Sequence, residues 1–136
     1  MTENNFNVLQ PKAWAAPKGY ANGIAAEGVQ VFIAGQIGWD KDAKLVSDDF
    51  VAQVEQALSN IVQVLAEAGG KPHHLVRVNW YVTDKVAYAT RQAEIGAAYR
   101  RTIGRHFPAM TLLVVAGLLE EGAKVEIEAT AVIPRA

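Results

Sequence analysis

The chain contains no cysteine, and this absence excludes several kinds of chemistry. Without a thiol the protein has no disulfides, no thiolate nucleophile and no cysteine-ligated metal. The chain also has no large excess of either sign of charge. Its 13 Lys and Arg residues and 14 Asp and Glu residues give a formal net charge of −1. This balance gives no overall field for holding nucleic acid or an anionic membrane. Neither is therefore expected as a partner.

The sequence also lacks a targeting or membrane-spanning segment. Its start, "MTENNFNVLQ", has neither the basic residues nor the apolar run of a secretion signal. No apolar run approaches the roughly 20 residues that cross a bilayer. A cytoplasmic protein is therefore expected. With 136 residues and no repeat or linker, residues 1–136 are expected to form one domain around one core.

Two helices are predicted from apolar stripes with helical spacing. Ser47 or Asp48 can cap the first helix, and Gly69-Gly70 with Pro72 can end it. Asp84 can cap a second helix that runs to about Gly104. The first stripe comprises Val51, Val54, Leu58, Ile61, Val62 and Leu65, and the second comprises Tyr88, Ile95, Tyr99 and Ile103.

Four strands are predicted from β-branched and alternating segments. They are "VQVFIAGQI" (29–37), "LVRVNWYVT" (75–83), "MTLLVVAGL" (110–118) and "AKVEIEATAVI" (123–133). About 25 residues before them are expected to form a loop or short edge strand. The order of elements predicts an α+β fold with a mixed sheet and two helices on one face. Because two helices cover one face, and a strand as apolar as "TLLVV" needs cover, a homo-oligomer is expected.

Histidines and arginines offer two candidate sites with simpler explanations. His73 and His74 would point to opposite faces of a strand, which makes a poor metal site, so we interpret them as exposed loop residues. Basic residues gather on and after the second helix and could contact an anion or RNA. A solvated helix face with cations near its negative end is the preferred interpretation. These residues are Arg91, Arg100, Arg101, Arg105 and His106.

Glu126 and Glu128 share one face of the last strand. They could belong to a polar sheet face paired with neighbouring cations. Alternatively, one glutamate faces a cleft near the "FPAM" turn and positions a water molecule. No HExxH, GxSxG or glycine-rich phosphate loop competes with this second reading.

Five segments, "GYANG", "VFIAGQIG", "YVTD", "FPAMT" and "KVEIEATAV", together resemble the Rid superfamily. These are the reactive-intermediate deaminases, also called the YjgF or endoribonuclease L-PSP family. The resemblance implies a chorismate-mutase-like α+β fold and a homotrimer with three ligand clefts between subunits, without metal or organic cofactor. The best-known members hydrolyse enamines and imines to 2-keto acids and ammonia.

The resemblance also implies roles for single residues. Tyr20 is expected to edge the cleft, Gly35 to contact the ligand through its backbone, and Glu126 to orient the attacking water. The position after "FPA" is an arginine in the deaminases and grips the substrate carboxylate. Here it is Met110, followed by Thr111 in the same predicted binding set.

Methionine at position 110 changes the expected ligand. An arginine–carboxylate fork gives two charge-assisted hydrogen bonds, each worth about 1.5–3 kcal/mol. Without it, ordinary 2-imino acids should bind badly, and a neutral or cationic ligand with an apolar or aromatic part is favoured. Alternatively, Met110 merely fills a core, or Lys18, Arg101 or Arg105 enters the cleft and restores the cation. Trp39 either lines the cleft or is an exposed turn residue.

Three functions therefore remain open from the sequence. The first is hydrolysis of a C=N bond in a substrate other than ordinary 2-imino acids. The second is a non-catalytic trimer that binds a small ligand or a regulatory partner. The third is ribonuclease activity, which the net charge and the lack of a suitable histidine pair argue against.

Overall fold

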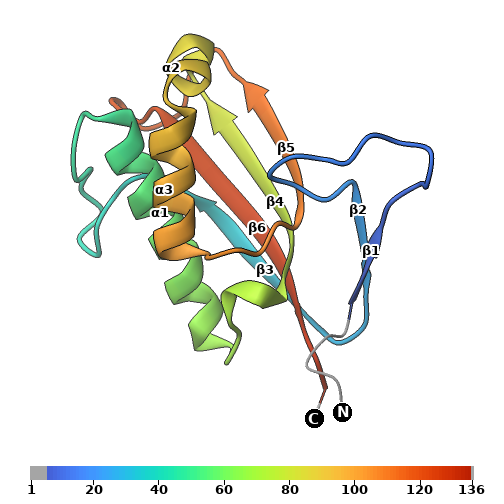
Figure 1. Cartoon of the computed structure of the whole chain (residues 1–136). Coiled ribbons are helices and arrows are strands. Elements are labelled where there is room, and N and C mark those ends of the chain that lie inside the picture. Colours follow the sequence, from blue (N-terminus) through green and yellow to red (C-terminus); the bar gives the residue numbers. More distant parts are fainter. Residues whose placement is uncertain (1–5, 136) are drawn as a thin grey trace.

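The computed structural model describes residues 6–135. A four-stranded mixed sheet in the order β3-β6-β4-β5 carries helices on one face, and a two-stranded β1-β2 hairpin stands beside it (Figure 1). Only β4 and β5 are parallel within the larger sheet. The strands are β1 (Phe6–Leu9), β2 (Gly23–Ala26), β3 (Val29–Gln36), β4 (Leu75–Val82), β5 (Ala109–Val114) and β6 (Val125–Ile133). The helices are α1 (Phe50–Glu67), η1 (Pro72–His74), α2 (Lys85–Thr90) and α3 (Gln92–Thr102).

Helix α1 follows its predicted stripe but begins slightly later than expected. Its N-cap is Asp49, whose carboxylate accepts a hydrogen bond from the Ala52 N–H at 2.9 Å. Ser47 instead accepts from the Asp49 N–H at 2.9 Å and holds the cap residue in place. Gly69 has a φ of 78° and ends the helix, a conformation that favours glycine.

The second predicted helix is broken into α2 and α3. Asp84 caps α2 as predicted, accepting from the N–H groups of Val86 and Ala87. The break at Arg91 has two physical causes. The Thr90 hydroxyl bonds back to the Val86 carbonyl at 2.8 Å, a contact that bends helices. The Arg91 guanidinium also pairs with Asp49 of α1 at 2.8 Å and with Glu94 of α3 at 2.7 Å.

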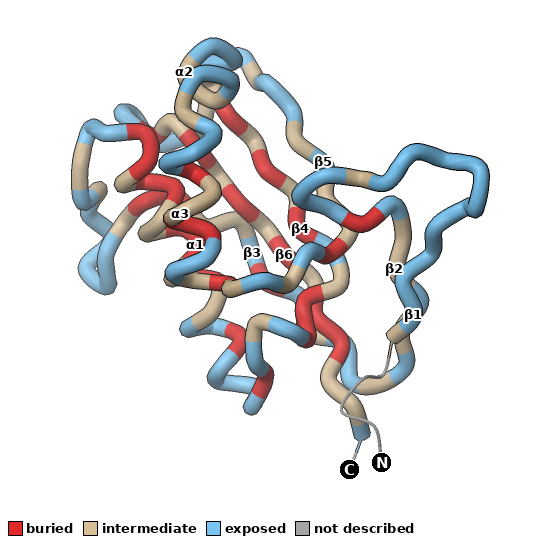
Figure 2. Tube along the Cα trace, in the orientation of Figure 1, coloured by how far each residue is buried: buried red, intermediate tan, exposed pale blue. Residues whose placement is uncertain are grey.

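The two faces of the sheet differ sharply. The helical face is buried, and Figure 2 shows the buried residues concentrated along β4, β6, α1 and α3. On the open face, Phe32 is 73% exposed and Leu113 is 50% exposed. The structure thus confirms the mixed sheet with helices on one face, and it leaves apolar side chains uncovered on the other.

The prediction for the paired histidines was wrong in part. His73 and His74 lie in the single turn η1 with their rings 4.2 Å apart, and His73 is exposed as predicted, whereas His74 is not. His74 is buried, and its Nδ1 accepts the Lys71 N–H at 3.0 Å. Strand periodicity does not reveal this burial, because both histidines lie in a turn. Among residues 6–135, no group of three or more His, Asp or Glu side chains could hold a metal ion.

Candidate functional site

Gly35 and Glu126 come together although 91 positions separate them in the chain. Strand β3 pairs with β6, and its register shifts between Ile33 and Gln36, beside Gly35. The Glu126 carboxylate lies over Gly35 so closely that a Cβ there would be 2.2 Å from Oε2. Within residues 6–135 this carboxylate has no hydrogen-bond or ion-pair partner. Glycine therefore leaves the space in which an unpaired, half-buried acid group sits.

Glu128, two residues along the same strand, has a different environment. Its Oε1 accepts hydrogen bonds from the Tyr81 hydroxyl at 2.6 Å and from Asn79 Nδ2 at 3.1 Å. The bond from Tyr81, and then that from Asn79, hold the pKa of Glu128 below its ordinary value of 4.5. Of the two glutamates, Glu128 is the one built into a polar sheet face, and Glu126 is the one left available.

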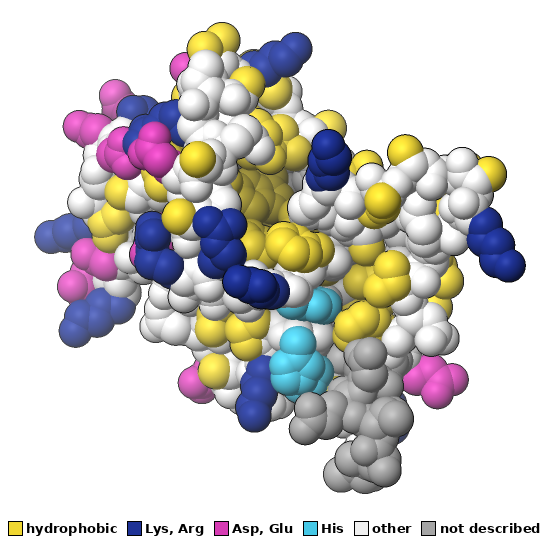
Figure 3. All heavy atoms as spheres, viewed as in Figure 1, with side chains coloured by type: hydrophobic (Ala, Val, Ile, Leu, Met, Phe, Trp, Pro, Cys, Tyr) yellow, Lys and Arg dark blue, Asp and Glu magenta, His cyan; other side chains and the backbone are white. Residues whose placement is uncertain are grey.

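Met110 lines a pocket on the other face of the sheet, next to the helices. Its strand position pairs with Val78, and its side chain packs against the core there. The pocket has a volume of about 230 Å³. Figure 3 shows a hollow lined by hydrophobic side chains beside α3, with basic side chains at its rim. The lining residues are Lys18, Gly19, Trp80, Tyr88, Gln92, Ile95, Gly96, Tyr99, Phe107, Met110 and Leu112.

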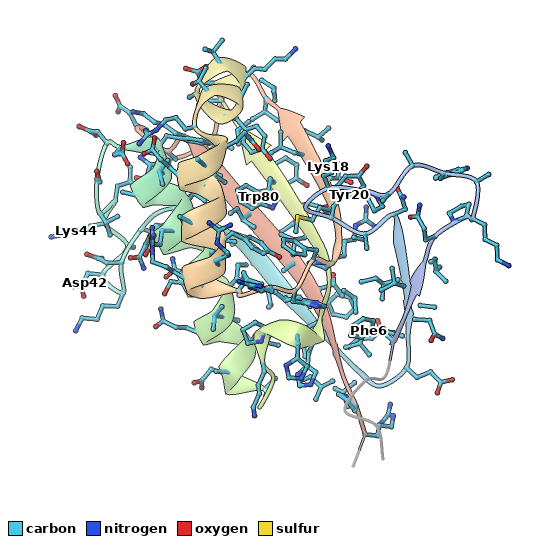
Figure 4. All side chains as sticks on the ribbon, in the orientation of Figure 1. Phe6, Lys18, Tyr20, Asp42, Lys44 and Trp80 are labelled. Carbon is cyan, nitrogen blue, oxygen red and sulfur yellow. The ribbon has the colours of Figure 1, made fainter. Side chains whose placement is uncertain are left out.

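Tyr20 lies beside this pocket, and Thr111 does not. Ala21, next to Tyr20, bridges to Ala109, and its N–H donates to the Pro108 carbonyl at 3.0 Å. Figure 4 shows Lys18, Tyr20 and Trp80 in this region. Thr111 pairs with Asn79 and lines a second hollow with Arg77 and Thr130, and Met110 lines this hollow as well. Alternation along the strand directs positions 110 and 111 to opposite faces, and Met110, close to the start of β5, borders both hollows.

Of the basic residues considered as substitutes for an arginine at position 110, Lys18 lines the pocket and Arg101 does not. Arg101 pairs with Glu55 of α1 at 2.5 Å, and this hydrogen bond lowers the pKa of Glu55. The Arg105 side chain is exposed and is not part of the pocket lining. Trp39 is half-buried, and its carbonyl accepts a hydrogen bond from Asn60 at 2.9 Å.

The predicted site residues form two groups within one chain. Glu126 pairs with Tyr81, and Tyr81 pairs with Leu113, three residues beyond Met110. With strands about 4.8 Å apart and about 3.3 Å per residue, the Cα atoms of Glu126 and Met110 are about 14 Å apart. Their side chains also lie on opposite faces of the sheet. Within one copy of the chain, the predicted site residues therefore do not form one continuous site.

Comparison with known proteins decides the family. The family model described as endoribonuclease L-PSP matches residues 10–133. The chain belongs to the Rid superfamily. It is 34% identical over 128 residues to a 2-iminobutanoate/2-iminopropanoate deaminase of Salmonella typhimurium, covering 92% of this chain and 95% of that protein.

Solved structures agree with this membership. A Rid family protein of unknown function from Yersinia pestis superposes with a TM-score of 0.82 at 32% identity, covering 96% of this chain and all of that chain. A RidA from an Antarctic Psychrobacter superposes with a TM-score of 0.67 at 31% identity, covering 93% and 99%. The mixed α+β architecture is thus that of the Rid superfamily. Among the described residues, no helix is both long and apolar enough to span a bilayer.

Proposed function

We propose that this Rid protein hydrolyses C=N bonds of imines or enamines, and that it does so as a homotrimer. The observation that carries this proposal is the unpaired Glu126 carboxylate held over Gly35. A carboxylate without a partner, at a gap kept open by glycine, is suited to binding and orienting one water molecule. The deaminase named among the relatives supports the reaction class.

The reaction needs water as its only co-reactant. Glu126 accepts a proton from the water as its oxygen adds to the carbon of the protonated imine, which gives a neutral carbinolamine. The same carboxyl group then returns that proton to nitrogen, and the C–N bond breaks. As the carbonyl forms, the hydroxyl proton passes through Glu126 to the departing ammonia, which leaves as ammonium. An enamine enters the sequence after protonation at carbon gives its imine. Tyr20 and the backbone near Gly35 and Met110 hold the substrate.

The trimer is proposed because one chain holds the parts of the site too far apart. Oligomerisation that sets the open face of one copy against the β5 edge of another would join Gly35 and Glu126 to Tyr20 and Met110. The exposed Phe32 and Leu113 side chains of the open face support such an interface. Each cleft would then contain residues from two copies.

Met110 sets the substrate apart from ordinary 2-imino acids. The family resemblance implies an arginine at this position, and methionine supplies a flexible apolar wall in its place. We therefore propose a substrate with an apolar part that fits beside Met110.

The test is imine hydrolysis with a matched pair of variants. A flavin amine oxidase generates imines of aromatic amines, which have an apolar part and no carboxylate, in the presence of semicarbazide, which traps whatever is not hydrolysed. Glu126→Gln should abolish the acceleration of hydrolysis, while Glu128→Gln, on the same face of the same strand, should retain most of it. Equal losses in the two variants would contradict the role given to Glu126. Binding without turnover in the unmodified protein would favour a non-catalytic binding trimer instead.

A further inference from the structure

Glu126 and Glu128 stand two positions apart on β6, the strand between β3 and β4 (Figure 1). Both side chains project from the same face of the sheet, because alternate residues of a strand point the same way. Their carboxylates nevertheless have different neighbours. The Glu126 carboxylate lies over Gly35 of β3. Glu128 Oε1 instead accepts hydrogen bonds from Tyr81 and Asn79 of β4. One carboxylate is thus turned toward each neighbouring strand.

The Tyr81 hydroxyl has two carboxylates within range and contacts the more distant one. In the pairing of β4 with β6, Tyr81 lies opposite Glu126 and diagonal to Glu128. Residues directly opposite each other have Cβ atoms about 4.5–5.5 Å apart, whereas diagonal neighbours are farther apart. The hydroxyl takes the diagonal and donates to Glu128 at 2.6 Å. This hydrogen bond is the largest cause that raises the pKa of Tyr81 above its ordinary value of 10.0, and the nearby charge of Glu126 contributes to the same rise.

The position of the Glu128 carboxylate explains why the hydroxyl takes the diagonal. Asn79 lies opposite Glu128 and donates from Nδ2 to the same Oε1 at 3.1 Å. Asn79 Oδ1 in turn accepts from Arg77 Nε at 3.4 Å. These contacts hold the Glu128 carboxylate on the β4 side, where it meets the Tyr81 hydroxyl. The 2.6 Å distance is typical of a hydroxyl that donates to an ionised carboxylate, which is a strong hydrogen bond.

A Tyr81 hydroxyl released from Glu128 would compete for Glu126. Tyr81 and Gly35 lie on opposite sides of β6, so a hydrogen bond from this hydroxyl would draw the Glu126 carboxylate away from Gly35. It would also occupy an oxygen lone pair that could otherwise hold a water molecule. Strand β3, Val29–Gln36, contains no charged residue that could pull the carboxylate back.

We propose that Glu128 is a positioning residue that holds the Tyr81 hydroxyl away from Glu126. The Glu126 carboxylate then stays over Gly35 with its oxygens free for the attacking water. This inference rests on the proposed function, because it concerns the same carboxylate. It gives Glu128 a part in the reaction without contact to the substrate.

Removal of the acceptor at position 128 tests the inference in the imine-hydrolysis assay. Glu128→Leu releases the hydroxyl, and kcat should fall at least about tenfold, because displacing a catalytic group by about 1 Å can cost about 100-fold. Adding Tyr81→Phe to Glu128→Leu should restore most of the activity, since the competing hydroxyl is gone. Tyr81→Phe alone should stay close to the unmodified protein. Glu128→Gln should also stay close to it, because the amide carbonyl still accepts the hydroxyl.

The double variant separates positioning from structural damage, because it keeps the leucine and loses one more polar group. If it is as slow as Glu128→Leu, or if Glu128→Leu is as fast as the unmodified protein, the inference is overturned. A crystal structure of Glu128→Leu gives a readout that needs no turnover. The Tyr81 hydroxyl should lie about 2.7 Å from a Glu126 carboxylate oxygen, and a hydroxyl that stays away from Glu126 would also overturn the inference.

The two readouts separate this inference from the proposed function. If the hydroxyl turns to Glu126 in the crystal while the unmodified protein hydrolyses no imine, the hold of Glu128 on Tyr81 stands and the deaminase proposal fails. If the unmodified protein hydrolyses imines and Glu128→Leu is equally fast, the deaminase proposal stands and the positioning role fails.

Discussion

Replacing Gly35 by alanine should slow imine hydrolysis without unfolding the protein. The new Cβ would lie 2.2 Å from Glu126 Oε2, 2.8 Å from its Cδ and 3.0 Å from its Cγ. To restore an ordinary contact near 3.4 Å, the carboxylate oxygen must retreat by about 1.2 Å. Misplacement of a catalytic group by about 1 Å can cost about 100-fold in rate. Because the obstructing atoms are the end of a flexible side chain, the fold should adjust at little cost.

The assay for Gly35→Ala measures kcat for imine hydrolysis beside the thermal midpoint of unfolding. The kcat is expected to fall by about 100-fold, and the midpoint should stay close to that of the unmodified protein. Gly117→Ala is the control, because a Cβ there meets nothing within 4 Å. An unchanged kcat in Gly35→Ala would refute the claim that the position of the Glu126 carboxylate governs the reaction.

Three further predictions concern stability, assembly and pH. Gln53→Leu removes hydrogen bonds from the buried amide to the Ser47 and Gly122 carbonyls and from the Lys124 N–H. Because water partly reaches these partners, we expect the free energy of unfolding in denaturant to fall by about 3 kcal/mol, the low end of the range for three unpaired groups. The exposed Gln63→Leu variant should lose almost none. If the protein forms the proposed trimer through the open face of the sheet, Phe32→Glu should shift the sedimentation coefficient to that of a monomer, whereas Val64→Glu on the exposed side of α1 should not. Burial lowers the pKa of His106 below its ordinary value of 6.5, so its contribution to stability is complete above pH 6.5 and falls as the pH drops toward the lowered pKa. Unfolding at pH 7.5 and 5.5 should show this decline, and His106→Phe should make it shallower; an equal slope in the variant would contradict the assignment.

The elements that depend on local patterns could be predicted from the sequence. The stripe from Val51 to Leu65 and the alternation from Val125 to Ile133 each report which face is buried, because periodicity records burial directly. The break at Arg91 could not be read in this way. It depends on a back-bonded threonine and on pairing with Asp49, which is 42 residues away.

The candidate site, too, has one part that the local sequence predicts and another that depends on residues far away in the chain. Glu126 could be singled out from its place on an alternating strand and from the family resemblance. That Glu126 has no partner while Glu128 has two depends on the pairing of β4 with β6. Asn79 lies opposite Glu128, and Tyr81, which lies opposite Glu126, sends its hydroxyl diagonally to Glu128. Lys18 reaches the pocket only because the loop before β2 lies against the start of β5. No signal in its neighbourhood of the sequence marks that contact.

The most direct test of a site shared between copies is complementation in mixed trimers. Glu126→Gln removes one half-site, and Gly96→Leu fills the pocket of the other. The latter should fold, because a Cβ at position 96 meets only the end of the Arg100 side chain, at 3.4 Å. Each variant alone should be inactive in imine hydrolysis. If clefts join two copies, co-refolding the variants in equal amounts should restore about a quarter of the unmodified activity, because about one cleft in four combines two intact halves. If the mixture stays as inactive as its components, the site is not shared between copies.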